Sequence, residues 1–130
     1  MARILGIGTE ITECLRIARM IEQHGEQFID RVYTPAEVRY CQGRPQSTQH
    51  FAARWAAKQA ILKALGVGSA RGVAWADVEI RRDSSGHPAV AARGAIKDLI
   101  ERQDVGEILV TFSHCRTHAT AYAIAFGREE

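Results

Sequence analysis

The sequence has 130 residues, of which 46% are hydrophobic and 25% are charged, and its formal net charge is +2. This length and composition fit a single globular domain, spanning 1–130, that can bury a core of its own. The small positive charge argues against a nucleic-acid partner but is compatible with a local binding site for an anion. No apolar run reaches the roughly 18 residues of a membrane span, and the N-terminus carries no secretion signal, so we expect a cytoplasmic protein with no membrane partner. The three cysteines have no metal-binding or redox spacing and are expected to be reduced thiols: Cys14, Cys41 and Cys115.

The chain opens with "RILGIGTEI", whose alternation predicts a β-strand over residues 3–11. One face of this strand carries Leu5, Ile7, Thr9 and Ile11, and the other carries Ile4, Gly6, Gly8 and Glu10. Glycines inside a strand indicate close approach of a ligand or of another backbone, so Glu10 is a candidate site residue. The alternative is a glutamate on an edge strand that simply faces solvent.

A first helix is predicted over residues 13–24, with Thr12 as its N-cap. Its inward face is expected to carry three apolar residues: Leu15, Ala18 and Ile21. Arg16 and Arg19 lie one turn apart on another side. They are either part of a solvated face or a docking stripe for an acidic partner.

The segment "TPAE" at residues 34–37 predicts a further helix start, because Thr34 and Glu37 form a capping box around Pro35. This helix should end near Gly43. A long helix then runs from about Thr48 to Leu65 and stops at Gly66.

The long helix carries a lysine where an apolar residue is expected. At about 100° per residue, Lys58 lies inside the apolar stripe, whose neighbouring members are Phe51, Trp55, Leu62 and Leu65. A buried ammonium group is costly unless an anion meets it. Arg54, one turn earlier, adds a second cation, and together they indicate a phosphate or carboxylate site. Lys63 lies beside Gln59 on a separate polar strip, where a solvated lysine is the alternative to a functional one.

The rest of the chain predicts a hairpin over residues 75–92, a helix over 95–103 and two strands over 107–114 and 118–126. Alanines share one face of the last strand and one side of the long helix, so we expect this helix to pack on that strand. The predicted fold class is therefore α+β, a single domain with a mostly antiparallel sheet packed with a long central helix. Ser113 and His114 end a strand, but no nucleophile elbow exists to support a Ser–His hydrolase.

Six segments resemble, in chain order, the holo-acyl-carrier-protein synthases, which are small 4′-phosphopantetheinyl transferases of bacterial fatty-acid biosynthesis. These segments are "GIGTEI", "YTPAE", "RWAAKQAILKALG", "DVEI", "GHP" and "SHCRTHATAYA". The resemblance covers nearly the whole chain. It implies a transferase that moves 4′-phosphopantetheine from coenzyme A to a serine of apo acyl carrier protein and releases 3′,5′-ADP. It also implies Mg²⁺ as cofactor and a homotrimer, and it identifies coenzyme A as the anion that meets the charge of Lys58 on the long helix.

The resemblance assigns the reacting end of the site to three residues. Glu10 stands where the family has a metal-binding aspartate, and Gln59 where it has a glutamate that binds metal and helps to activate the serine. Lys63 matches the lysine that meets the pyrophosphate and stabilises the leaving group.

The resemblance assigns other residues to binding. Ser113 and His114 match a pair that reaches the 3′-phosphate from a neighbouring subunit, and Arg54 and His87 match positions that line the nucleotide. Two arginines match the basic helix that docks the acidic carrier protein: Arg16 and Arg19.

Two departures from the family pattern concern the metal. Glutamate at position 10 keeps the charge on a longer arm, whereas Gln59 removes a charge and cannot accept a proton. A weaker Mg²⁺ site is expected, and the general base is either a water or Glu10 itself. The alternative function is a non-catalytic module on the same fold that binds coenzyme A or carrier protein. A third reading is a general binder of nucleotide phosphates.

Overall fold

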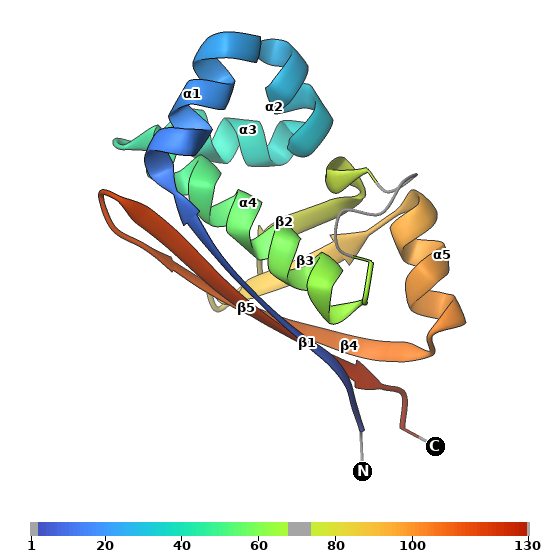
Figure 1. Ribbon diagram of the computed structural model, residues 1–130. Helices are drawn as coiled ribbons and strands as arrows, with labels where there is room; N and C mark the ends of the chain where they lie inside the picture. The colour runs from blue at the N-terminus through green and yellow to red at the C-terminus, as the bar shows by residue number, and fades with distance from the viewer. Residues whose placement is uncertain (1–2, 68–73, 130) are drawn as a thin grey trace.

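The computed structural model describes residues 3–67 and 74–129 and has the predicted α+β architecture (Figure 1). The strands are β1 (Ile4–Glu13), β2 (Val78–Arg82), β3 (Pro88–Ala92), β4 (Val105–His114) and β5 (His118–Gly127). The helices are α1 (Cys14–His24), α2 (Glu26–Val32), α3 (Pro35–Gln42), α4 (Ser47–Ala64) and α5 (Gly94–Arg102), with a 3₁₀ turn η1 (Trp75–Asp77). In the described part of the chain, no helix is long and apolar enough to cross a membrane. All three cysteines are free.

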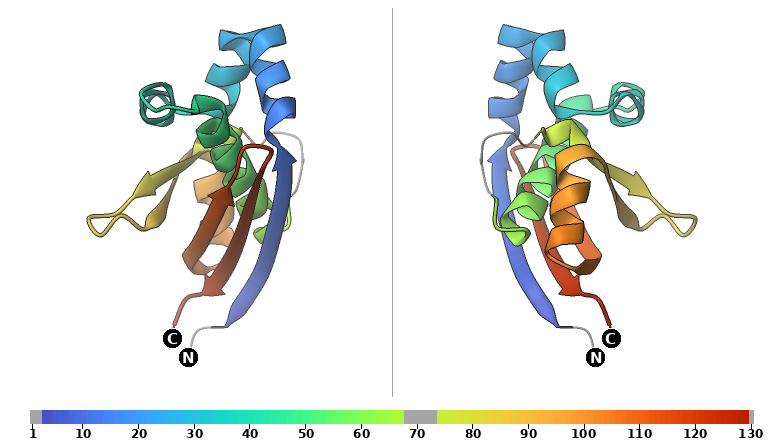
Figure 2. Two further views of the ribbon diagram at one scale, coloured as in Figure 1. Left: turned by 90° about the vertical axis from the view of Figure 1, so that its left-hand side faces the viewer. Right: turned by 90° about the vertical axis from the view of Figure 1, so that its right-hand side faces the viewer.

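The strands form two separate antiparallel sheets. Strands β1, β5 and β4 pair in that order, and β2 pairs only with β3, as a hairpin that extends away from the main body (Figure 2). Helix α4 crosses one face of the three-stranded sheet, and helices α1, α2 and α3 gather at one end of it (Figure 1). The prediction of an antiparallel sheet packed with the long helix is confirmed.

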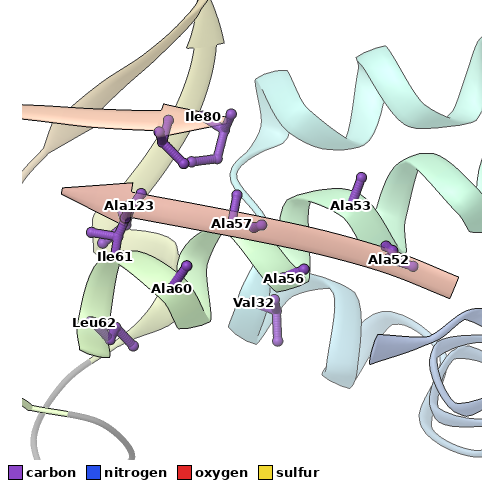
Figure 3. Packing of buried hydrophobic residues seen from close by; sticks show 14 of the residues in the cluster. Val32, Ala52, Ala53, Ala56, Ala57, Ala60, Ile61, Leu62, Ile80 and Ala123 are labelled. Carbon is purple, nitrogen blue, oxygen red and sulfur yellow. The ribbon is translucent and has the colours of Figure 1, made fainter. Parts of the chain in front are cut away.

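Alanines make the contact between α4 and the sheet. On α4 these buried alanines are Ala52, Ala53, Ala56, Ala57 and Ala60, and on β5 they are Ala119, Ala121, Ala123 and Ala125. Figure 3 shows the alanines of α4 lying along β5 beside Ala123. Because such side chains are short, the helix and the strand can lie close together, as the two alanine patterns predicted.

Two glycines of β1 bring α4 closer still. A methyl group on Gly6 would overlap the carbonyl oxygen of Ala64, and one on Gly8 would overlap the carbonyl oxygen of Ala60. The glycines therefore make room for a helix backbone rather than for a ligand. The same contact fixes β1 beside the last turns of α4, and Glu10 is the next residue on that face of the strand.

Within residues 3–67 and 74–129, no helix lies over the opposite face of the three-stranded sheet (Figure 2, left). Four large apolar side chains on it are at least half exposed: Ile7 (68%), Ile11 (67%), Tyr122 (56%) and Leu109 (50%). Strand pairing places them in adjoining rows across β1, β5 and β4. An exposed apolar surface of this kind is typical of interaction sites.

The start of α1 differs from the sequence prediction. The strand β1 runs on to Glu13, which occupies the N-cap without a side-chain hydrogen bond, so Thr12 is not the cap. Thr12 belongs to the strand, and its hydroxyl donates to Oε2 of Glu10 at 3.2 Å. The buried residues of α1 are Cys14 and Ile17, whereas Leu15, expected to face inward, is 56% exposed, so the inward face of the helix was placed wrongly by the sequence pattern.

The anion that meets Lys58 is a glutamate of the protein. Nζ of Lys58 lies 2.7 Å from Oε1 of Glu37, and both side chains are fully buried. Lys58 also donates to the carbonyl oxygens of Trp75, at 3.1 Å, and of Val78. The interpretation that coenzyme A is the counter-ion of Lys58 is therefore wrong, because the carboxylate of Glu37, 21 residues earlier in the chain, already pairs with it.

Glu37 links several elements at once. Its side chain closes the predicted capping box, accepting from the amide of Thr34 at 2.9 Å, while the Thr34 hydroxyl accepts from the amide of Glu37. Its other oxygen accepts from the amide of Ile80 at 2.8 Å. One carboxylate thus ties α3 to α4 and to β2, which gives the pair a structural role.

We predict that Gly8→Ala destabilises the fold by about 1–3 kcal/mol or more, because the new methyl group meets helix backbone that cannot move aside alone. Urea denaturation of both proteins measures this. The matched control is Gly43→Ala, since Gly43 has φ −79° and its nearest atom would lie at 3.4 Å. That control should change stability by less than about 0.5 kcal/mol. Equal stabilities of the two variants would contradict the close contact.

We also predict strong coupling between Lys58 and Glu37. Lys58→Met and Glu37→Gln should each lower the free energy of unfolding by about 3–5 kcal/mol, because each leaves a buried group without its partner. The double variant should lose clearly less than the sum of the two, measured by denaturant unfolding. A parallel cycle on Lys63 and Glu10, whose lysine side chain is 48% exposed, should show coupling of at most about 1 kcal/mol. Additive losses at Lys58 and Glu37 would show that the pair is not coupled.

Candidate functional site

The structure gathers one group of predicted site residues where β1 meets the last turns of α4. Nζ of Lys63 lies 2.7 Å from Oε1 of Glu10 and donates to the carbonyl oxygen of Thr9 at 3.0 Å. Gln59 is half-buried and lies one helical turn before Lys63, on the polar strip that the sequence predicted. We call Glu10, Thr12, Gln59 and Lys63 the Glu10 cluster.

Both oxygens of Glu10 have donors in this cluster. Lys63 is bonded to Oε1 and Thr12 to Oε2, and the Glu10 side chain is 16% exposed. The carboxylate is therefore held in a fixed position at the sheet edge, next to an ammonium group that is half exposed. A site with opposite charges side by side can bind a cation and a phosphate together.

The Glu10 cluster offers few oxygen ligands for a metal. Among residues 3–67 and 74–129, no three or more His, Cys, Asp or Glu side chains come together as a metal site. The carboxylate of Glu10 and the amide oxygen of Gln59 suit Mg²⁺, which commonly takes one or two protein ligands and completes its shell with water and phosphate. They would not suit a metal that needs a full set of protein ligands.

A second group surrounds Tyr40 on α3. The guanidinium carbon of Arg44 lies 3.6 Å from the centre of the Tyr40 ring, that of Arg54 lies 3.9 Å from it, and that of Arg82 lies 6.0 Å from it. Arg54 is only 2% exposed, and its Nε and Nη1 have no hydrogen-bond partner among the described residues. We call Tyr40, Arg44, Arg54 and Arg82 the arginine cluster.

The arginine cluster carries positive charge without a neighbouring acid. None of the ion pairs within the described part of the chain involves Arg44, Arg54 or Arg82. Partial burial raises the pKa of Tyr40, but hydrogen bonds and charge from the nearby arginines outweigh it and lower this pKa to about 8. The cluster is therefore suited to binding an anion.

His114 lies next to the arginine cluster. Its Nδ1 is 2.9 Å from Oε1 of Gln49, and its ring meets that of His50 edge-on, with centres 4.9 Å apart. The ring of His50 in turn meets that of Tyr40, at 5.8 Å. Burial, and then the charge of His114 and of nearby arginines, lowers the pKa of His50. These contacts bring two predicted residues, Arg54 and His114, into one region.

Ser113 lies apart from that region, and His87 lies at its border. Consecutive strand residues point to opposite faces, so Ser113 lies on the outer, apolar face of the sheet while His114 points toward α4. His87 is 78% exposed and has Nδ1 3.9 Å from Oδ1 of Asp83. It directly follows Gly86, whose carbonyl oxygen accepts from Nη1 of Arg82 at 2.9 Å.

The two clusters are separate groups in a single chain. The Glu10 cluster is on the edge strand β1, whereas His114 is on β4, at the other edge of the sheet. Along α4, nine residues separate Arg54 of the arginine cluster from Lys63, which corresponds to about 14 Å of helix. The two clusters therefore lie toward opposite edges of the sheet, on either side of the middle of α4.

Arg16 and Arg19 are both exposed on α1, the helix that follows directly from β1. The guanidinium carbon of Arg16 lies 6.0 Å from the ring of Trp55. This places a basic and partly aromatic surface at the end of β1 beyond the Glu10 cluster.

The sequence reasoning missed Tyr40, Arg44 and Arg82. Tyr40 and Arg44 come from α3 and the residues just after it, whereas Arg82 ends β2, and no sequence motif connects the two segments. The available signal was the lack of acidic residues between positions 38 and 58, next to several basic ones.

The comparisons agree on one family. The model of the 4′-phosphopantetheinyl transferase superfamily matches residues 6–126. A holo-[acyl-carrier-protein] synthase of Rhodopirellula baltica is 48% identical over 121 residues, which span 93% of this chain and 96% of that protein. The crystal structure of such a synthase from Neisseria meningitidis has a TM-score of 0.86 and 29% identity, covering 95% of this chain and 98% of its own. One from Bacillus anthracis, in complex with CoA (3′,5′-ADP), has a TM-score of 0.78 and 28% identity, covering 98% of this chain and 100% of its own.

Proposed function

The chain belongs to the 4′-phosphopantetheinyl transferase superfamily, and we propose that it is a holo-acyl-carrier-protein synthase. It transfers 4′-phosphopantetheine from coenzyme A to a serine of apo acyl carrier protein and releases 3′,5′-ADP. The observation that carries the proposal is the Glu10–Lys63 pair, a carboxylate and an ammonium 2.7 Å apart at the sheet edge. Coenzyme A is the donor and acyl carrier protein the acceptor, and a cytoplasmic location follows from this activity.

Lys63 has the clearest chemical role. Attack of the serine hydroxyl on the β-phosphate of coenzyme A builds negative charge on the leaving phosphate. An ammonium group held by the Thr9 carbonyl and by Glu10 is already positioned to stabilise that charge. Lys63 is half exposed, so it can turn from Glu10 to a pyrophosphate oxygen, and a bound cation would then replace it as the counter-ion of Glu10.

Glu10 and Gln59 are the residues that would hold Mg²⁺, which when bound neutralises charge at the pyrophosphate oxygens. Thr12 and Lys63 keep the Glu10 carboxylate oriented toward that space. Gln59 cannot accept the proton of the serine. The base is therefore a water or Glu10, whose carboxylate is freed for this purpose once Lys63 moves to the pyrophosphate.

The nucleotide end of coenzyme A is assigned to the arginine cluster, with Arg54 and His114 closest to the predicted roles. Arg54 is buried, so it attracts a phosphate by its charge without contacting it, and exposed members of the cluster, such as Arg44, make the direct contact. Ser113 and His87 keep their assigned nucleotide contacts as a proposal. Both lie on surfaces that a neighbouring subunit could share with this one.

We propose a homotrimer in which each of the two clusters is one half of a site shared between neighbouring subunits. The exposed apolar face of the sheet, with Ile7, Ile11, Leu109 and Tyr122, gains stability if a second copy covers it. A head-to-tail ring brings the Glu10 cluster of one subunit to the arginine cluster of the next. Each subunit then contributes one half to each site.

Carrier-protein docking is assigned to Arg16 and Arg19. These exposed cations follow β1 on α1, beside the exposed Leu15, and an acidic partner would be steered toward them. The docked serine would arrive at the end of β1, where the Glu10 cluster lies.

A second candidate function is a non-catalytic module that binds coenzyme A or carrier protein. Gln59 favours it, because the Glu10 cluster then holds a single carboxylate. The variant Gln59→Glu separates the two functions. If the natural chain binds coenzyme A without transferring the group, and Gln59→Glu transfers it, the natural chain is the module.

We predict that the natural chain modifies apo acyl carrier protein in the presence of coenzyme A and Mg²⁺, seen as the added phosphopantetheinyl group in an intact mass spectrum. Lys63→Met should slow the transfer about 10²–10³-fold, because one positioned donor to the developing charge is lost. The matched control is Lys97→Met, an exposed lysine on α5, which should transfer at the natural rate. Equal rates for the two variants would overturn the role of Lys63.

We further predict that two inactive chains complement each other. Glu10→Ala removes one half-site and His114→Ala the other, so each variant alone should be inactive. In randomly mixed trimers, about one quarter of the sites combine both intact residues, and a matching share of activity should return. The measurement is the transfer rate after co-expression, with Glu10→Ala mixed with itself as control. Mixed samples that stay inactive would show that the site lies within one chain.

A further inference from the structure

Tyr40 occupies an unusual position between two cations. Its ring centre lies 3.6 Å from the guanidinium carbon of Arg44 and 3.9 Å from that of Arg54. Two planar guanidinium groups this close to one ring would collide on the same face, so they lie on opposite faces. Arg44 reaches the ring from the segment after α3, and Arg54 reaches it from α4.

The ring of Tyr40 holds the two guanidinium groups in place. Two guanidinium groups repel each other, but each is attracted to the electron-rich face of the ring between them. Stacking also fixes the plane of each group, so that its N–H bonds point outward around the ring edge. Nε and Nη1 of Arg54 have no partner in the described part of the chain but are buried, whereas Arg44 is exposed. Both charges are therefore fixed in position before a ligand binds, and Arg44 is the one that a ligand can contact at the surface.

We propose that Tyr40 is a positioning residue for the phosphate at the nucleotide end of the substrate. Its ring holds Arg44 and Arg54 in place, and its hydroxyl makes the affinity of these arginines for the phosphate depend on pH. This role rests on the proposed function, because it takes the ligand to be the 3′-phosphate of coenzyme A. Nothing in the sequence marks Tyr40, which lies in a helix end between "AEVR" and "CQGR".

When it is ionised, the Tyr40 hydroxyl competes with the phosphate for the arginines. The charged or titratable groups that face Tyr40 come from the segment after α3, from α4 and from β2: Arg44, His50, Arg54 and Arg82. The arginines overcome the opposing effect of partial burial and bring the pKa of Tyr40 down to about 8. Below that pH the phenol is neutral and the cluster keeps its full positive charge. Above it the phenolate neutralises part of that charge, so a phosphate binds less tightly.

Linkage between phosphate binding and the ionisation of Tyr40 gives the direction in which the affinity changes with pH. A bound phosphate disfavours the phenolate, so binding at alkaline pH requires uptake of a proton by Tyr40, and affinity falls by up to about tenfold per pH unit. His50, whose pKa is lowered by burial and by nearby cations, titrates on the acid side of this change. The alkaline loss of affinity is therefore assigned to Tyr40.

The test measures binding of 3′,5′-ADP by calorimetry from about pH 7 to about pH 9.5, with EDTA present and the full protein used throughout. The probe has no thiol and no pantetheine arm, so it reports only the nucleotide end. Tyr40→Phe keeps the ring and removes the hydroxyl. It should bind within about twofold of the natural chain near pH 7 and lose the alkaline fall in affinity. Tyr40→Leu removes the ring and should bind about three- to thirtyfold more weakly at every pH.

Two further measurements separate positioning from general damage. Lys97→Met changes an exposed residue of α5 that belongs to neither cluster, and it should keep the alkaline fall in affinity. In the transfer assay, Tyr40→Leu should raise KM for coenzyme A and leave KM for the carrier protein unchanged. A fall in affinity that persists in Tyr40→Phe would overturn the role of the hydroxyl, and natural affinity in Tyr40→Leu would overturn that of the ring. If the natural chain neither binds 3′,5′-ADP nor transfers the group, the proposed function itself fails.

Discussion

The direct contact between the backbones of α4 and β1 is the constraint on which the rest of this structure depends. Gly6 and Gly8 allow it because any larger side chain would overlap the carbonyl oxygens of α4. With no side chains between helix and strand, the two polar residues just beyond the contact, Glu10 and Lys63, meet at 2.7 Å. The same contact leaves little room for bulky residues under the helix. Large apolar side chains of β1 and β5, such as Ile7, Ile11 and Tyr122, therefore face the other way.

The other side of α4 is fixed by charge rather than by small residues. Lys58 and Glu37 are completely buried, and Glu37 also bonds the amides of Thr34 and Ile80. A pair of this kind adds little net stability compared with apolar residues, but it tolerates few alternative arrangements. Held on both sides, α4 acts as a rigid support. It carries Lys63 near its C-terminal end and Arg54 near its middle, so the helix itself sets the spacing between these two residues.

The charges of the two clusters complement the proposed substrate. The Glu10 cluster combines one carboxylate, one amide and one ammonium, which suits a pyrophosphate together with a hard cation. The arginine cluster has cations and no carboxylate partner among the residues described, which suits a phosphate monoester. Because Gln59 adds no charge, the pyrophosphate must supply most of the attraction for a metal. Binding of metal and of coenzyme A should accordingly be strongly coupled.

The sequence by itself determined the features that depend on neighbours along the chain. The capping box of Thr34 and Glu37, the strand alternation around Gly8 and the alanine faces of α4 and β5 follow from residue spacing, and so do Lys58 in the apolar stripe and Lys63 on the polar strip. Only the tertiary structure decided which distant groups meet. It gave Lys58 the carboxylate of Glu37, moved Thr12 from a helix cap to Glu10, and placed Tyr40 between Arg44 and Arg54. The physical reason is that a buried charge requires a partner but does not specify which one, and that choice is made by the packing of segments far apart in the chain.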